Sequence, residues 1–319
     1  MVDARRWSAV ESQEDVVVIG GGAGGLNAAL ILARARRRVL VVDRGNPRNA
    51  PARQVHGFVS RDGTPPGELL AVGRAEVERY GGRIVADEVR AVRRIDIRSG
   101  EAESEGGFEV ELSDRTVRTR RVIAATGLRD ALPDLPGLRE RWALDVLHCP
   151  YCHGWEVRDR PLGVLGWQPM AVHQALLVRQ LSDDVVFFAE VLDDEGRAKL
   201  AARGVRIVDA DVSGLVVKDD ELRGVRLADG TTVARSALFV PPRFVPNDAP
   251  LAGLGCERDD SGRLRVDPGG RTSVPGVWAV GNLVEPGALV VTAAAAGAKA
   301  ALTVNTDLVE EDLRERERV

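Results

Sequence analysis

The feature that most constrains the fold of this chain is a run of glycines between a β-branched segment and an apolar helix. Residues 16–19 are all β-branched, residues 20–25 contain five glycines, and residues 26–35 are predominantly apolar over a helical length. A second apolar run, residues 39–42, ends in Asp43. Strand, glycine turn, helix, strand and acid follow one another in this order in a βαβ unit that binds a nucleotide.

The glycine run satisfies the dinucleotide-binding fingerprint at Gly20, Gly22 and Gly25. The first glycine allows a tight turn, the second lets the backbone approach a pyrophosphate, and the third lets helix and strand pack closely. The helix N-terminus then offers free N–H groups to the phosphates, and Asp43 is placed to accept hydrogen bonds from a ribose. The pattern predicts nucleotide binding, but it does not distinguish FAD from NAD.

Composition places the chain among globular proteins. Its 319 residues suffice for two domains, and apolar and charged residues make up 44% and 29%. The formal charge of -4 gives no reason to expect a nucleic-acid partner, and no apolar run is long enough to predict a membrane span. We expect residues 1–15 to form a polar arm rather than a signal peptide. Because two of the three cysteines share one CxxC motif, we expect a cytoplasmic protein.

A second strand–turn–helix–strand pattern occupies residues 162–188, and Pro-rich stretches at 132–137 and 241–250 flank it. We interpret these stretches as crossings between two domains. The sequence therefore predicts an α/β protein with two Rossmann-like three-layer nucleotide-binding domains, the second inserted in the first. The expected boundaries are 16–128 with 243–319 for the first domain and 129–242 for the inserted domain.

Redox chemistry is concentrated in residues 148–155, which read His-Cys-Pro-Tyr-Cys-His-Gly-Trp. The spacing of Cys149 and Cys152 lets their sulfur atoms reach disulfide distance within one turn of chain. Thiol exchange needs a thiolate and a base, and His153 directly follows the second cysteine, with His148 as the alternative. Zinc is the competing interpretation, but both histidines adjoin cysteines, where joint chelation is strained, and the sequence offers no second ligand pair. We predict a redox-active pair and no metal site.

Two later segments favour FAD as the nucleotide. Ala124-Ala125-Thr126-Gly127 ends one predicted strand, and residues 276–282, GVWAVGN, end another. With these segments the sequence resembles the flavin-dependent disulfide reductases, and among them the low-molecular-weight thioredoxin reductases, over nearly the whole chain after residue 15. The fingerprint, the ATG segment, the CxxC motif and the late glycine segment occur in that family's order. The resemblance implies an FAD-dependent thiol–disulfide oxidoreductase that forms a homodimer.

The resemblance also implies which residues hold the flavin. In the family a late Gly-Asp contributes to the FAD site, and here Asn282 replaces the acid with an uncharged side chain that can still hydrogen-bond a ribityl chain. His56 lies in a long loop, where lining the flavin pocket and a plain surface position are both open interpretations. The residues expected to bind FAD are Gly20, Gly22, Ala23, Gly24, Gly25, Asp43, Arg44, Arg48, His56, Val89, Ala125, Thr126, Gly127, Gly281, Asn282, Leu289 and Val290.

The second βαβ unit lacks a complete nicotinamide fingerprint. Gln168 stands where a glycine would admit the pyrophosphate, and Trp167 adds bulk beside it. Glu190 follows the next strand and could accept from an NADH ribose, but no arginine cluster is present to pair the 2′-phosphate of NADPH. We therefore expect that the nicotinamide site is defective and that NAD(P)H is not the electron donor.

A flavin and a CxxC pair without a nicotinamide site favour electron flow from the substrate to the flavin. The segments Cys149–Glu156, Gly281-Asn282 and Pro47-Arg48-Asn49 resemble the small-molecule dithiol oxidases of natural-product pathways, such as those of gliotoxin, holomycin and romidepsin. The resemblance implies that Cys149 accepts a substrate thiolate and that Cys152 passes electrons to FAD. It further implies that O2 is the electron acceptor, which yields hydrogen peroxide, and that the substrate is a small dithiol.

Three alternatives stay open at this point. One is a thioredoxin reductase that uses NADH or another donor, such as ferredoxin. A second is a flavin-binding regulator without catalysis, which would not need the CxxC motif. The third is an oxidase of protein dithiols with a folded partner. Cys256 is expected to be a small buried hydrophobic residue.

Overall fold

The chain forms two compact units in a computed structural model that describes residues 13–95, 98–99, 102–103 and 106–317. The first unit contains residues 13–50, 67–129 and 246–317, and the second contains Pro51–Pro66 and Asp130–Val245. The segment Pro51–Pro66 therefore packs with the second unit, although the expected boundaries gave it to the first. The expected end of the polar arm at residue 15 is also wrong, because strand β1 already begins at Gln13. Residues 1–12 lie outside the described residues.

The first unit is built on a mixed sheet with the strand order β3-β2-β1-β8-β7-β4, and β19 pairs with β8. The parallel part joins β1, β2, β3, β8 and β19, as expected for a nucleotide-binding fold. β4 and β7 extend it in antiparallel fashion, and β5 and β6 form a separate pair. The bounds are β1 (Gln13–Ile19), β2 (Val39–Asp43), β3 (Arg83–Ala86), β4 (Ala91–Ile95), β5 (Arg98–Ser99), β6 (Ala102–Glu103), β7 (Gly107–Glu111), β8 (Thr116–Ala124) and β19 (Val277–Ala279).

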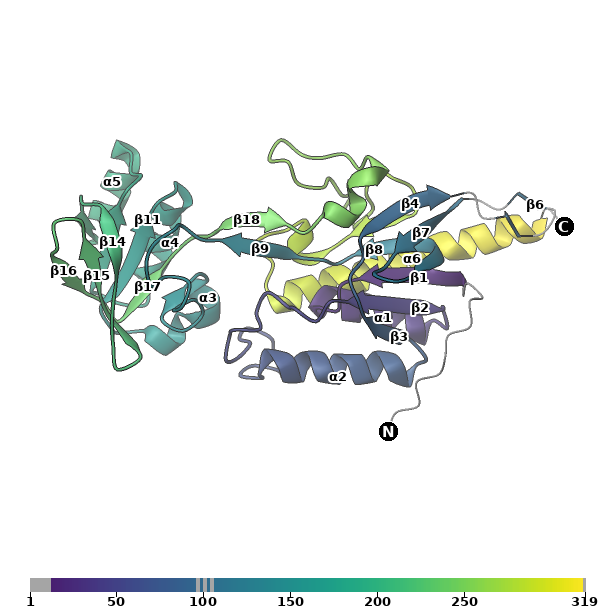
Figure 1. Ribbon diagram of the computed structural model, residues 1–319, viewed down its shortest axis with the longest axis horizontal. Helices are drawn as coiled ribbons and strands as arrows, with labels where there is room; N and C mark the ends of the chain where they lie inside the picture. The colour runs from purple at the N-terminus through teal and green to yellow at the C-terminus, as the bar shows by residue number, and fades with distance from the viewer. Residues whose placement is uncertain (1–12, 96–97, 100–101, 104–105, 318–319) are drawn as a thin grey trace. The chain divides into compact units, whose positions relative to one another are not determined.

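Helices cover one face of this sheet. Alternate residues of β1 point to opposite faces, so Val16 and Val18 pack against the helices while Val17 and Ile19 face β4 and β7. Figure 1 shows helices α1, α2 and α6 alongside the parallel strands. A side chain at Gly297 would collide with the backbone of Gly24, so α1 and α6 touch where both lack one. The bounds are α1 (Ala23–Arg34), α2 (Pro66–Arg79), α6 (Val290–Glu317) and the 3-10 helix η2 (Ala249–Leu254).

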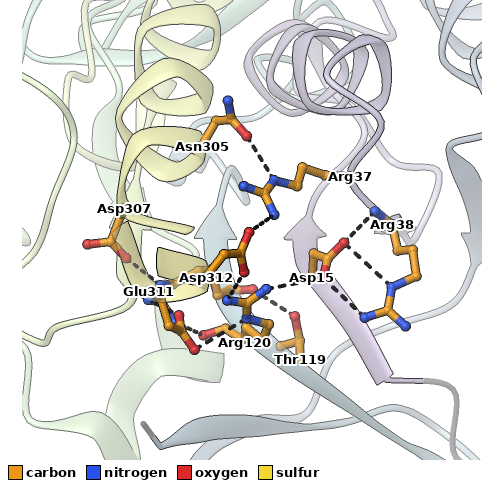
Figure 2. Close-up of polar contacts among 10 residues, drawn as sticks. Asp15, Arg37, Arg38, Thr119, Arg120, Asn305, Asp307, Glu311 and Asp312 are labelled. Carbon is orange, nitrogen blue, oxygen red and sulfur yellow. Dashed lines mark hydrogen bonds and ion pairs between the residues drawn. The ribbon is translucent and has the colours of Figure 1, made fainter. Parts of the chain in front are cut away.

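A network of charged and polar side chains fixes the C-terminal end of α6 to the sheet (Figure 2). Glu311 is only 2% exposed and pairs with both Arg120 and Arg121 of β8. Asp312 accepts from Arg120 at 2.6 Å and from Arg37 at 2.8 Å. Buried charges are tolerated when each is paired, so this network stabilises the packing of the last helix turns. Its remaining members are Asp15, Arg38, Thr119, Asn305 and Asp307.

The second unit has the three layers that the sequence predicted. Its central sheet is parallel with the order β10-β17-β11-β12-β13. One face packs on helices α4 and α5 through Val164 and Phe187, and the other packs on an antiparallel sheet through Val186 and Phe188. The bounds are β10 (Val146–Leu147), β11 (Leu162–Gly166), β12 (Val185–Ala189), β13 (Arg206–Val208), β14 (Val212–Lys218), β15 (Glu221–Leu227), β16 (Thr232–Ala234), β17 (Ala237–Phe239), α4 (Met170–Val178) and α5 (Asp194–Ala202).

Two short strands, β9 (Leu128–Ala131) and β18 (Arg243–Pro246), carry the chain between the units and pair with each other. They adjoin or overlap the two Pro-rich stretches that the sequence marked as crossings. Both units are Rossmann-like α/β folds, so the predicted fold class is confirmed. Within the described part of the chain, no helix combines the length and the apolar character that a bilayer crossing requires.

Candidate active site

The CxxC motif forms a short helical turn that a disulfide closes. Cys149 is bonded to Cys152, and their Cα atoms lie 5.2 Å apart. Cys149 precedes helix α3 (Pro150–His153), in which Pro150 occupies the first position, where a missing N–H is harmless. The backbone N–H of Cys152 donates to Cys149 Sγ at 3.1 Å. This contact favours negative charge on Cys149, so the turn supports a thiolate there once the disulfide opens.

His153 lies directly after the disulfide and is half-buried. Burial lowers the pKa of its imidazole below the usual value of 6.5; Glu156 opposes this shift and His56 adds to it. The imidazole is therefore neutral at pH 7 and can accept a proton from a thiol. Its position and its protonation state both suit the predicted acid/base role.

The segment Pro51–Pro66 brings a second histidine into the same unit. His56 Nδ1 lies 3.3 Å from each carboxylate oxygen of Asp62, and His56 Nε2 lies 3.5 Å from Glu156 Oε1. Asp62 also accepts from the Gly57 backbone N–H at 2.9 Å, and this bond, followed by that of His56, holds the pKa of the Asp62 carboxyl below its usual value. His56 is thus tied to carboxylates of the second unit, and its role in FAD binding stays a prediction.

Helix α4 and strand β18 hold the chain in place at His148. Gln174, a buried residue of α4, donates from Nε2 to the backbone carbonyl of His148 at 2.6 Å. The His148 ring packs edge-on against Phe244, with ring centroids 5.3 Å apart. These contacts hold the chain just before Cys149 in place, and they give His148 a packing role whether or not it moves protons.

The glycine turn of the first unit has the geometry that a pyrophosphate requires. Gly20 has a φ of +104°, and a side chain there would collide with the Ala125 backbone. A side chain on Gly25 would collide with the Gly20 carbonyl, so helix and strand approach closely only because both residues are glycines. Gly22 precedes α1, and among the described residues no atom lies within 4 Å of a Cβ added there and no side chain caps the helix. The first N–H groups of α1 are therefore open to an anion.

Asp43 ends β2 beside this turn. Its carboxylate accepts a hydrogen bond from Arg74 Nη2 of α2 at 2.8 Å. A side chain on Gly21 would collide with the same carboxylate, so the acid lies directly against the glycine backbone. The neighbouring Arg44 is exposed and pairs with Glu88 at 3.5 Å. Asp43 is thus held against the glycine turn, and its contact with a ribose stays a prediction.

The strand end at Thr126 offers a polar atom for a ligand. Thr126 Oγ1 is buried and has no hydrogen-bond partner among the described residues. The Thr126 backbone carbonyl accepts from Asn247 Nδ2 at 3.0 Å, and Gly127 follows with a φ of +65°. A buried hydroxyl without a partner is costly, so this atom is a natural point of contact for a bound cofactor.

The late glycine segment forms a loop that leads into α6. Gly281 has a φ of +67° and begins the 3-10 helix η3 (Gly281–Leu283). The side-chain amide of Asn282 donates from Nδ2 to the carbonyls of Glu285, Pro286 and Ala288, at 3.2, 3.1 and 3.0 Å. The amide nitrogen therefore closes the loop, which leaves Oδ1 as the atom available to accept from a ligand.

The second unit has side chains where a dinucleotide fold carries its glycine turn. Trp167 Nε1 donates to the Pro241 carbonyl at 2.7 Å, and Gln168 Nε2 donates to the same carbonyl. Trp167 and Gln168 follow β11, and Pro241 lies just after the neighbouring parallel strand β17. Near the end of β12, burial raises the pKa of the Glu190 carboxyl, and the charge of Asp211 raises it further.

Comparison with known proteins identifies the family. Residues 14–297 match the pyridine nucleotide-disulphide oxidoreductase family. The chain belongs to this family. It is 31% identical to thioredoxin reductase sirT of Leptosphaeria maculans, over 96% of this chain and 97% of that protein. Thioredoxin reductase tcpT of Claviceps purpurea is also 31% identical, over 84% of this chain and 86% of the relative.

Solved structures agree with this assignment. The crystal structure of HlmI superposes with a TM-score of 0.91 at 56% identity, over 96% of each chain. An oxidoreductase from Agrobacterium tumefaciens superposes with a TM-score of 0.84 at 36% identity, over 93% of this chain and 99% of the other. Together with the disulfide, the family membership identifies the protein as an FAD-dependent disulfide oxidoreductase.

The first unit fits the FAD that this family uses. The open glycine turn suits a pyrophosphate, Asp43 suits a ribose, and the buried Thr126 hydroxyl, which has no partner in the described part of the chain, offers a further contact. Ala125 and Gly281 lie at neighbouring strand ends, since β8 and β19 are paired. The remaining predicted positions lie in the same unit: Ala23 and Gly24 in the first turn of α1, Arg48 half-buried in the loop after β2, Val89 in the core, and Leu289 and Val290 at the start of α6.

Sequence reasoning missed three residues that the fold brings to the CxxC turn. Glu156 follows His153 at a helical spacing, and that spacing was the available signal. Gln174 had no local signal, because it reaches the His148 carbonyl only through tertiary packing, whereas Asp62 pairs with His56 within their own loop. Among the described residues, no group of three or more His, Cys, Asp and Glu side chains is arranged to hold a metal ion.

Proposed function

We propose that this protein is an FAD-dependent dithiol oxidase that closes an intramolecular disulfide in a small natural product, with O2 as the electron acceptor and hydrogen peroxide as a product. One combination of features carries the proposal. A complete FAD fingerprint and a CxxC disulfide occur together with a second nucleotide fold in which Trp167 and Gln168 occupy the site of the glycine turn.

The second unit supports the direction of electron flow. In doubly wound folds a dinucleotide binds at the carboxyl ends of the strands, with its pyrophosphate on the glycine turn. Here Trp167 and Gln168 bridge two strand ends to the Pro241 carbonyl at that edge. If no nicotinamide reduces the flavin, a substrate dithiol is the electron source, and the Cys149–Cys152 disulfide is the group that accepts its electrons.

The exchange begins at Cys149. A substrate thiolate bonds to Cys149 Sγ, the bond between Cys149 and Cys152 breaks, and Cys152 leaves as a thiolate. The proton of the attacking thiol goes to the neutral imidazole of His153, which later passes it to solvent. The Cys152 N–H that points at Cys149 Sγ stabilises this sulfur when it leaves in the next step.

The second exchange closes the product. The other substrate thiol loses its proton to the same imidazole and attacks the substrate sulfur that is bonded to Cys149. The substrate disulfide forms, Cys149 leaves as a thiolate, and two electrons and two protons have left the substrate. FAD, when bound, would supply the two-electron acceptor for the two cysteine thiolates, so that the bond between Cys149 and Cys152 could re-form with O2 as the final acceptor. The overall reaction is dithiol plus O2 to disulfide plus hydrogen peroxide.

The similarity to HlmI at 56% identity supports a shared chemistry, while two relatives are named thioredoxin reductases. Those names favour a second candidate function, a reductase of disulfides that takes electrons from NADH or another donor. With the oxidase proposal we expect a small dithiol as the substrate, a homodimer and a cytoplasmic location. We expect no nucleic-acid or membrane partner.

A spectral experiment separates the two candidates. Under anaerobic conditions, a small dithiol such as dithiothreitol should bleach the flavin of the purified protein without any nicotinamide, and air should restore the oxidised spectrum. If NADPH or NADH bleaches the flavin rapidly while dithiols do not, the oxidase proposal fails and the reductase proposal holds.

A further inference from the structure

The segment Pro51–Pro66 has an unusual place in the chain. It separates β2 from α2 in the sequence of the FAD-binding unit, yet it packs with the unit that carries the CxxC motif. One ion pair within that unit links it to the turn after the disulfide, because His56 Nε2 lies 3.5 Å from Glu156 Oε1. Glu156 belongs to the 3-10 helix η1 (Trp155–Val157), which directly follows α3.

His56 is oriented on its other side as well. Its Nδ1 lies 3.3 Å from both oxygens of Asp62, and the Gly57 backbone N–H donates to one of them at 2.9 Å. Carboxylates only accept hydrogen bonds, so each ring nitrogen of His56 faces an acceptor. Asp62 thus fixes the ring, and the opposite nitrogen is directed at Glu156.

Glu156 follows His153 by three residues, and Gly154 between them is helical, so Glu156 and His153 lie on the same side of this turn. The Glu156 charge raises the pKa of His153, whereas His56 and, above all, burial lower it. The other charge of this turn, Arg158, is stacked over the Trp155 ring at 3.8 Å and pairs with Asp159 at 4.0 Å. Among the described residues, the charges that shift the pKa of His153 are those of Glu156 and His56.

We propose that His56 and Glu156 act as a positioning pair for His153, so that the segment Pro51–Pro66 belongs to the thiol–disulfide site. Glu156 pairs with His56 and lies one helical turn after His153, and we expect His56 to limit how strongly this carboxylate acts on His153. The role in catalysis rests on the proposed function, because an oxidase turnover requires His153 to accept and release a proton twice. A base does this best when its pKa lies near the working pH.

The first experiment follows the titration of His153 by NMR in the oxidised holoprotein. Only four histidines are present, so single histidine substitutions assign each imidazole signal. In Glu156→Gln the titration of His153 should move to lower pH, and in His56→Gln it should move to higher pH. The matched controls are His173→Gln and Glu195→Gln, which alter exposed residues of α4 and α5 and should leave the titration unchanged. If His153 titrates alike in all of these proteins, the positioning pair is refuted.

The second experiment measures flavin reduction by dithiothreitol against pH. The acid limb of the profile should shift in the same directions in the two variants, and an unshifted limb in both would overturn the role in exchange. If dithiothreitol fails to reduce the flavin in the wild type, the oxidase function is wrong, while the NMR titration still decides whether the pair acts on His153.

Discussion

The indole Nε1 of Trp167 donates a 2.7 Å hydrogen bond to the carbonyl oxygen of Pro241. This bond joins the end of β11 to the chain after β17, two neighbouring parallel strands of the second unit. It therefore lies along the edge at which doubly wound folds bind dinucleotides. Gln168 donates to the same acceptor, so both residues that stand in place of the glycine turn are hydrogen-bonded to one backbone carbonyl.

Weak binding of NADPH and NADH is the first prediction. The loss of two hydrogen bonds to a charged pyrophosphate, at about 1.5 kcal/mol each, corresponds to an affinity lower by about a hundredfold. Stopped-flow absorbance should show slow or no flavin reduction by either nucleotide at concentrations where dithiothreitol reduces the flavin completely. Rapid reduction by either one would contradict this reading of Trp167 and Gln168.

The second prediction concerns the two cysteines. Cys149→Ser and Cys152→Ser should each abolish dithiol oxidation, because a serine hydroxyl cannot form the disulfide that accepts the electrons. Both variants should retain FAD, since the glycine turn and Asp43 lie in the other unit. Cys256→Ser is the matched control and should keep full activity. Turnover in either CxxC variant would rule out the thiol mechanism.

The third prediction is a pH dependence. Burial lowers the pKa of His153, so its neutral, proton-accepting form persists as the pH falls below 6.5. After allowance for ionisation of the dithiol itself, the rate of flavin reduction should stay level to below this pH and then decline. His153→Gln should lower the rate by roughly a hundredfold or more and remove the decline. An unchanged acid limb in His153→Gln would assign it to another group.

The fourth prediction concerns the stability of the FAD-binding unit. Glu311→Ala should reduce the free energy of unfolding by about 3 kcal/mol, because it leaves Arg121 buried with fewer partners. Arg121 keeps its contact with Asp307 at 2.5 Å, which places the cost at the low end for a broken buried pair. Glu310→Ala alters an exposed neighbour and should change the stability by less than about 0.5 kcal/mol in denaturant titration. Equal effects of the two substitutions would show that the network adds little.

The FAD cradle and the CxxC turn could be predicted because their information is local. The roles of Gly20, Gly22 and Gly25 follow from their spacing within one strand–turn–helix unit, and the collisions that side chains would cause at Gly20 and Gly25 agree with it. Cys149 and Cys152 likewise need only one turn of chain to reach each other.

Features that depend on tertiary packing could not be predicted from the sequence. Glu14 and Asp15 suggested a polar arm, yet they are buried in β1 and paired with Arg83 and Arg38. The pairing of His56 with Glu156 was equally hidden, because nothing in the sequence indicates that the loop between β2 and α2 packs with the second unit. Charged residues look exposed in a sequence until their partners are known.

The most direct test of the central claim is an oxygen-electrode measurement on the purified holoprotein with a small dithiol and no nicotinamide. If electrons pass from the dithiol through Cys149 and Cys152 to FAD and O2, then oxygen consumption, hydrogen peroxide and substrate disulfide should appear in equal amounts. Dithiol-independent oxygen uptake, or turnover that starts only when NADPH or NADH is added, would contradict the account.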